Sequence, residues 1–122
     1  IFQHIADAGV DMFHCSQRRY WEPEFPGSDM NLAGWMRRLL GKPTITVGSV
    51  GMAGPMSVTD VGERAEVSTD LAPLIARLEA GEFDLVAVGR SLLADPEWAC
   101  KLREGRLDQM QPFTKEALDI LY

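Results

Sequence analysis

The sequence has few cysteines and lacks both a long apolar run and a leader-like start. Cys15 and Cys100 stand far apart, which excludes a disulfide framework and the closely spaced ligand pairs of a zinc site. No stretch reaches the roughly 18 apolar residues of a membrane span. No basic region precedes an apolar run at the start of the chain. We therefore expect a cytoplasmic protein with reduced thiols, no bound metal and no membrane partner.

Basic residues are also in deficit. Twelve Lys and Arg stand against eighteen Asp and Glu, which gives a formal net charge of −6. Such a chain repels a phosphate backbone, so we expect no nucleic-acid partner. The balance still permits one local basic site for a single phosphate group.

The chain is short for a closed α/β barrel. With 122 residues and 46% apolar residues, the chain suits one small globular domain. A closed eight-stranded α/β barrel needs about twice as many residues. Because the chain begins with Ile1 rather than Met, we expect it to be a piece of a longer protein.

Apolar runs predict three buried parallel strands, and helical patterns lie between them. The strands are expected at Val10–Cys15, Thr44–Val50 and Phe83–Val88. A helix over 32–40 would be capped by Asp29 or Asn31 and end at Gly41. The other helices are expected from Thr69 or Asp70 to Gly81 with Pro73 in the first turn, from Asp95-Pro96 to Gly105, and from Thr114 through Leu121.

The alternation of strands and helices predicts an α/β fold with a parallel sheet and right-handed crossovers. Three strands with helices on one side leave an apolar face, so either the chain is a fragment of a barrel or a partner completes the sheet. Two long connections, 16–30 and 52–67, follow the first two strands. Loops of this length at the carboxyl ends of strands are often functional.

Two glycine turns end consecutive strands, and they are the strongest functional signal. One is Val47–Gly51 and the other is Val88–Arg90. Glycine lets a ligand approach the backbone, and the Arg90 fork matches two phosphate oxygens. In α/β barrels such loops, with a short helix like the one expected over 91–94, form a phosphate site. The alternative is that both turns are only tight turns and Arg90 lies at the surface.

Three segments carry a resemblance to a known family: Phe13-His14-Cys15-Ser16-Gln17-Arg18-Arg19-Tyr20-Trp21-Glu22-Pro23-Glu24-Phe25, Ile45-Thr46-Val47-Gly48-Ser49-Val50-Gly51 and Asp84-Leu85-Val86-Ala87-Val88-Gly89-Arg90-Ser91-Leu92-Leu93-Ala94-Asp95-Pro96. Together they resemble the carboxyl-terminal third of an Old Yellow Enzyme-type NADH:flavin oxidoreductase. The last segment is the most specific.

This resemblance implies that the chain holds the last three strands and helices of a TIM (β/α)8 barrel. Residues 1–122 would be the carboxyl-terminal part of a single FMN-binding domain, with no complete second domain. The FMN phosphate would be held by backbone amides near Gly51 and Met52, by Gly89 and by the Arg90 side chain. The family transfers hydride from NAD(P)H through the flavin to an activated alkene, a small-molecule substrate.

The resemblance places no catalytic residue in this chain. The family's substrate-holding His pair and its proton-donating Tyr sit on earlier strands, so the chain alone is expected to be inactive. Its expected partners are the remaining barrel strands or a second copy. We interpret His14 as a structural hydrogen-bonding residue, and Tyr20 matches no proton donor of the family.

Two further features have a structural and a functional interpretation. A basic-aromatic cluster, comprising Arg18, Arg19, Tyr20, Trp21 and Phe25, either borders the flavin or packs on its own scaffold, and we favour packing. Cys15 is more typical of a small buried hydrophobe than of a nucleophile. Two other functions stay open for the whole chain: an α/β-barrel enzyme that binds a phosphorylated metabolite, and a non-catalytic α/β module.

Overall fold

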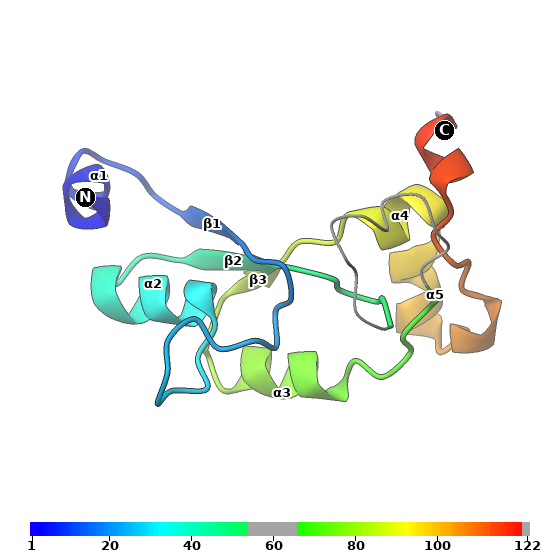
Figure 1. The fold of residues 1–122 in the computed structure, drawn as a ribbon, viewed down its shortest axis with the longest axis horizontal. Helices are drawn as coiled ribbons and strands as arrows, with labels where there is room; N and C mark the ends of the chain where they lie inside the picture. Colours follow the sequence, from blue (N-terminus) through cyan, green and yellow to red (C-terminus); the bar gives the residue numbers. More distant parts are fainter. Residues whose placement is uncertain (54–65, 121–122) are drawn as a thin grey trace. The chain divides into compact units, whose positions relative to one another are not determined.

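The computed structural model describes residues 1–53 and 66–120, which fall into two compact units. Unit 1 comprises Ile1–Gly48 and Leu71–Ala87, and unit 2 comprises Ser49–Asp70 and Val88–Tyr122. Within the described ranges, no helix combines the length and the apolar character needed to cross a membrane. The elements in chain order are α1 (Phe2–Asp7), β1 (Phe13–Ser16), α2 (Leu32–Leu40), β2 (Thr44–Val47), α3 (Ala72–Glu79), β3 (Leu85–Val86), α4 (Arg90–Ala94), α5 (Trp98–Glu104) and the 3-10 helices η2 (Leu107–Gln109) and η3 (Lys115–Leu118) (Figure 1).

Unit 1 contains a three-stranded parallel sheet in the order β1-β2-β3. Phe13 of β1 lies opposite Thr44 of β2, and Ile45 of β2 lies opposite Leu85 of β3. The predicted alternation of strands and helices, and the parallel pairing that it implies, are therefore confirmed. The strands are shorter than the apolar runs predicted.

The barrel assignment is wrong for this structure. β1 and β3 each pair with β2 alone among the described residues, so the sheet is open and has two edges. A barrel closes because every strand is bonded on both sides. Here β3 has only two residues, and the chain after Ala87 belongs to the second compact unit. What holds is a small α/β unit with a parallel sheet.

The two faces of the sheet differ in burial because side chains alternate along each strand. Cys15, Thr44 and Thr46 share one face and are buried, and α2 packs on β1 and β2. In Figure 1 both α2 and α3 are drawn below the strands. His14 and Leu85 lie on the opposite face and are exposed.

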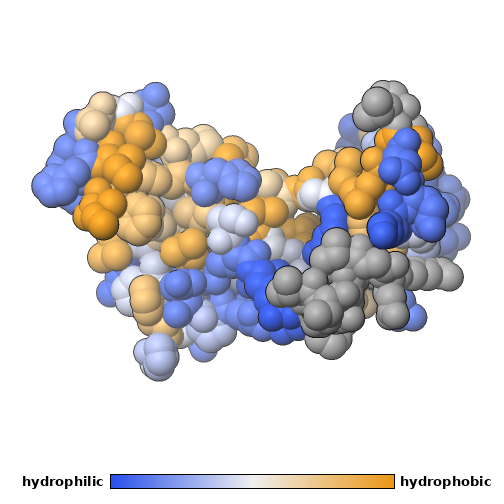
Figure 2. Space-filling view, turned by 45° about the horizontal axis from the view of Figure 1, so that its top comes forward, coloured by the Kyte–Doolittle hydropathy of each residue, from blue (hydrophilic) through white to orange (hydrophobic). Residues whose placement is uncertain are grey.

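Apolar side chains are also exposed around α1. On the face shown in Figure 2, hydrophobic surface gathers at the α1 end of unit 1. Large apolar residues there keep 40% or more of their surface exposed: Ile1, Phe2, Ile5 and Met12. Helix α1 has only six residues, of which only Ala6 is buried. Packing within unit 1 therefore covers little of this helix.

Helix α2 begins and ends where the sequence predicts. The side chain of Asn31 accepts a hydrogen bond from Gly34 N–H at 2.9 Å, so Asn31 rather than Asp29 is the capping residue. Gly41 ends the helix in the left-handed conformation, and its N–H donates to Arg37 O. The residues at both ends are those that local chemistry predicts, and the start is also held by Leu32 N–H, which donates to Gln17 Oε1 at 2.7 Å.

Helices α3 and α5 begin later than predicted. Leu71, not Thr69 or Asp70, occupies the N-cap position of α3. Helix α5 begins at Trp98 rather than at Asp95-Pro96, because Asp95 O accepts from Trp98 N–H in a preceding turn. The predicted end of α5 at Gly105 and the short helix α4 are confirmed. The expected last helix is the 3-10 helix η3, which ends at Leu118; residue 121 lies outside the described residues.

Most of the predicted loop 52–67 lies outside the described residues, which omit 54–65. Its two described ends pair as an antiparallel bridge between Met52 and Val67. Ala53 N–H donates to Glu66 O at 2.9 Å, and Ser68 N–H donates to Gly51 O at 3.1 Å. These bonds hold the turn after β2 in place within unit 2.

Candidate functional site

All four residues that the sequence singles out lie in unit 2. Gly51 and Met52 follow β2, Gly89 precedes α4, and Arg90 is the first residue of that helix. Ser91 joins the two glycine turns, because its hydroxyl donates to Val50 O at 2.7 Å. The structure thus brings together residues that are almost forty positions apart in the sequence.

Gly51 is glycine for reasons of packing. It is buried, with φ at 73°, and an added Cβ would lie 2.9 Å from Ser91 Oγ and 3.0 Å from Trp98 Cζ2. Both the positive φ and the close contacts exclude a side chain. At this position the protein's own α4 and α5 fill the space that a ligand was expected to approach.

Gly89 has the opposite surroundings. It is exposed, and no heavy atom lies within 4 Å of the place a Cβ would take. Among the residues that the structure describes, none accepts a hydrogen bond from the N–H of Gly89 or of Gly51. Gly89 is therefore the glycine that leaves backbone open to a ligand, and its N–H is a donor suited to an anion.

Met52 contributes to the structure of unit 2 mainly by the packing of its side chain. Its N–H already donates to Ser49 O at 3.2 Å, within the turn itself. The side chain is 6% exposed and belongs to a small core with Phe113 and Ala117, against which Ala94 packs. Met52 therefore ties the turn after β2 to the carboxyl-terminal part of unit 2.

Arg90 supplies the positive charge of the site. Its side chain is partly buried, and the guanidinium carbon lies 5.8 Å from the ring centroid of Phe113. Burial lowers the pKa of Arg90, but an arginine stays protonated at neutral pH. The cation thus sits over the core that holds Met52, on the residue that follows the open Gly89 in the chain.

A buried ion pair supports this region, and no sequence motif indicates it. Lys101 Nζ donates to both carboxylate oxygens of Asp95, which also accepts from Gln111 N–H at 3.2 Å. Burial by itself would raise the pKa of Asp95, but the bonds from Lys101 and Gln111 outweigh it and lower the pKa. Neither the charges nor their spacing in the sequence predicts that both would be buried.

The basic-aromatic cluster packs on its own scaffold, as the structural interpretation predicted. Arg19 pairs with Glu22 at 2.5 Å. Tyr20 is buried, and its ring meets that of Trp21 edge-on with centroids 5.0 Å apart. Phe25 packs edge-on against Trp35 at 5.5 Å. Tyr20 is therefore packed in unit 1, whereas Trp21 and Phe25 make ring contacts but stay 38% and 51% exposed.

Cys15 is a buried residue, as predicted. It is 4% exposed, and burial raises the pKa of its thiol, which lowers the fraction of reactive thiolate. His14, its neighbour, is exposed on the uncovered face of the sheet. Neither residue has the surroundings of an activated nucleophile.

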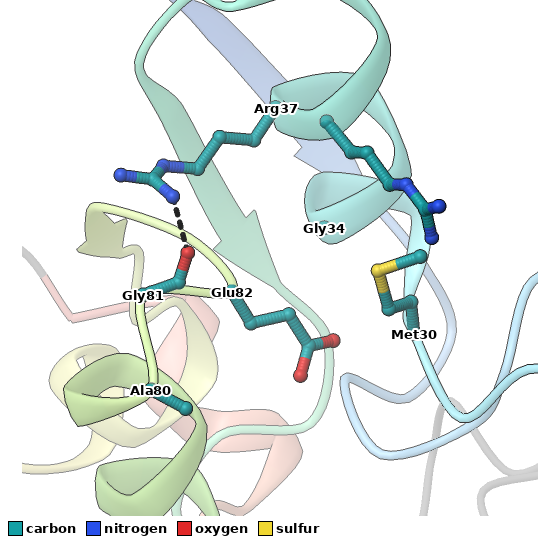
Figure 3. Close-up of a pocket in the computed structure, with 7 residues that line it drawn as sticks. Met30, Gly34, Arg37, Ala80, Gly81 and Glu82 are labelled. Atoms are coloured by element: carbon teal, nitrogen blue, oxygen red, sulfur yellow. Dashed lines mark hydrogen bonds between the residues drawn. The ribbon is translucent and has the colours of Figure 1, made fainter.

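Unit 1 carries a groove of about 400 Å³ between α2 and the turn that follows α3 (Figure 3). Two of its charged groups already have partners: Arg37 donates to Gly81 O and pairs with Asp84, and Glu82 pairs with Arg77 at 3.1 Å. None of the four predicted site residues lines it. The lining residues are Met30, Gly34, Arg37, Arg38, Ala80, Gly81 and Glu82.

Comparison with known proteins gives a partial likeness. No family model matches the chain. The sequence is 34% identical over 119 residues to an NADH oxidase of Thermoanaerobacter brockii, and the match covers 91% of this chain. The chain spans only 16% of the length of that relative. The likeness supports a relationship to oxidoreductases and goes no further.

Proposed function

We propose that this chain is part of an NAD(P)H-dependent flavin oxidoreductase that reduces activated alkenes, and that unit 2 binds the phosphate of FMN. The name of the relative, NADH oxidase, supports a nicotinamide-linked reaction. The resemblance to Old Yellow Enzyme-type proteins supports a flavin cofactor and an alkene substrate. FMN, when bound, supplies the hydride-transfer chemistry. The same proposal places the protein in the cytoplasm and makes this chain one part of a larger flavin-binding domain.

The residues of unit 2 fit a phosphate. Gly89 is exposed, with free space beside its Cα and an N–H that no described residue engages. The next residue, Arg90, adds a guanidinium whose two N–H edges match phosphate oxygens. Gly51 belongs to the same site through its contact with Ser91, and Met52 through the Phe113 core. The proposal rests on one observation: the open backbone of Gly89 is followed directly by the arginine Arg90 at the start of α4.

The chain itself provides binding and orientation. We assign Arg90 to the phosphate as a fixed cation, and Gly89 as the backbone donor beside it. Gly51 keeps the turn after β2 close to α4 because no side chain intervenes. The groups that hold the substrate and donate its proton belong to parts of the protein outside this chain, so residues 1–122 alone should be inactive.

The proposal is tested in the full-length protein that contains this chain. FMN and riboflavin are titrated against the wild type, Arg90→Ala and Arg90→Lys. Losing the charge-assisted bonds should weaken FMN binding by roughly ten- to a hundredfold, or about 1.5–3 kcal/mol. Riboflavin lacks the phosphate, so its affinity should not change. Arg90→Lys keeps the charge but not the planar fork, so its FMN affinity should lie between those of the wild type and Arg90→Ala.

Unchanged FMN affinity in Arg90→Ala would remove Arg90 from the site.

The same geometry also suits an enzyme that binds a phosphorylated metabolite. Flavin absorbance in the purified full-length protein distinguishes the two functions, because only the flavoprotein is yellow.

A further inference from the structure

The hydroxyl group of Ser91 connects the two glycine turns of unit 2. It donates to Val50 O at 2.7 Å, and Ser91 and Val50 are 5% and 4% exposed. A bond this short between buried groups is well shielded from competing water. No sequence motif assigns Ser91 a role beyond its place in the short helix expected over 91–94.

The position of this bond relates it directly to the phosphate site. Ser91 follows Arg90 in the chain, and Val50 precedes Gly51. One hydrogen bond therefore fixes the start of α4 against the turn after β2. The ring of Trp98 lies 3.0 Å from the same Cβ position of Gly51 that Ser91 Oγ approaches to 2.9 Å, so residues of α4 and α5 both contact this turn.

We propose that Ser91 is a positioning residue of the phosphate site, acting through Arg90 and the Gly51 turn. This inference rests on the proposed function. Because its single proton is donated to Val50 O, the hydroxyl has none to offer a phosphate dianion. Ser91 therefore sets the spacing between the two turns, and contact with the phosphate falls to Arg90 and to backbone N–H groups.

The test is a double-mutant cycle in the full-length protein. FMN and riboflavin dissociation constants are measured for the wild type, Ser91→Ala, Arg90→Ala and the double variant. Ser91→Ala should weaken FMN binding by about two- to tenfold, the range of one hydrogen bond, and leave riboflavin unchanged. In the Arg90→Ala background the same change should have a smaller effect on FMN binding, since one of the two groups that Ser91 positions is gone.

Three results would overturn the assignment: unchanged FMN affinity in Ser91→Ala, an equal loss for FMN and riboflavin, or full additivity with Arg90→Ala. An equal loss would show that Ser91 only stabilises the fold, and full additivity would show that Ser91 does not act through Arg90. If Ser91→Ala does not fold, Ser91→Cys, which keeps a weak donor of similar size, takes its place in the cycle. A wild type that does not prefer FMN to riboflavin contradicts the proposed function itself. A wild type with that preference and a Ser91 variant without effect contradicts this inference alone.

Discussion

Lys101 and Asp95 form a buried, two-point ion pair, with Lys101 Nζ 2.9 Å from Asp95 Oδ1 and 2.8 Å from Oδ2. Their side chains are 9% and 3% exposed. Asp95 also accepts from the N–H groups of Glu97 and Gln111, both at 3.2 Å. The carboxylate therefore connects the end of α4, the helix α5 and the segment after η2.

Removing one partner of this pair should destabilise the protein strongly. Lys101→Met leaves the Asp95 carboxylate buried without its counter-charge, at a cost of about 3–5 kcal/mol. Combining it with Asp95→Asn removes both charges and should recover part of the loss. The free energy of unfolding, measured with urea, checks both variants. A loss below about 1 kcal/mol in Lys101→Met would show that the pair contributes little.

The same carboxylate makes stability depend on pH. The pKa of Asp95 is lower in the folded protein than in the unfolded chain, so its contribution is complete above about pH 4, near the unfolded value. It is lost as the pH falls through the folded pKa. Unfolding curves between pH 7 and pH 2.5 should show the stability difference between wild type and Asp95→Asn shrinking below pH 4. A constant difference down to pH 2.5 would contradict the lowered pKa.

Adding a methyl group should lower stability at Gly51 but leave it almost unchanged at Gly89. Gly51→Ala forces a Cβ against Ser91 Oγ and Trp98 at a positive φ, which should cost roughly 1–3 kcal/mol of stability. Gly89→Ala meets open space and should change stability by less than about 0.5 kcal/mol. By the proposed function, however, Gly89→Ala should weaken FMN binding. Thermal melts and FMN titration of the full-length protein measure the two effects, and equal melting losses would contradict this assignment.

Asn31 should be the most sensitive polar position of unit 1. It is fully buried; its oxygen caps α2, and its Nδ2 donates to Tyr20 O and Thr46 Oγ1, both at 3.0 Å. Asn31→Ala should cost about 2–4 kcal/mol, combining the cap with two buried hydrogen bonds. Asn31→Ser keeps a capping oxygen and should recover about 1 kcal/mol. Urea unfolding compares the variants, and equal losses would exclude the cap as a separate contribution.

The sequence was a good guide wherever local chemistry decides the outcome. Gly41 and Gly105 end their helices as predicted because a left-handed residue is intrinsic to such ends. Asn31 caps α2 for the same kind of reason. The buried pair Asp95–Lys101 had no such local sign, because its energy comes from a fold that removes both groups from water. The roles of Gly51, Met52, Gly89 and Arg90 toward FMN stay predictions.

The residue pattern predicts correctly the order of strands and helices, the parallel pairing and the buried state of Cys15. These follow from side-chain period, turn residues and the need to hide apolar runs from water. The folded structure alone reveals the open sheet and the assignment of the residues between β2 and α4 to two different compact units. It also decided which glycine is closed by packing and which is open. These features depend on contacts between residues distant in the chain, and no local pattern records them.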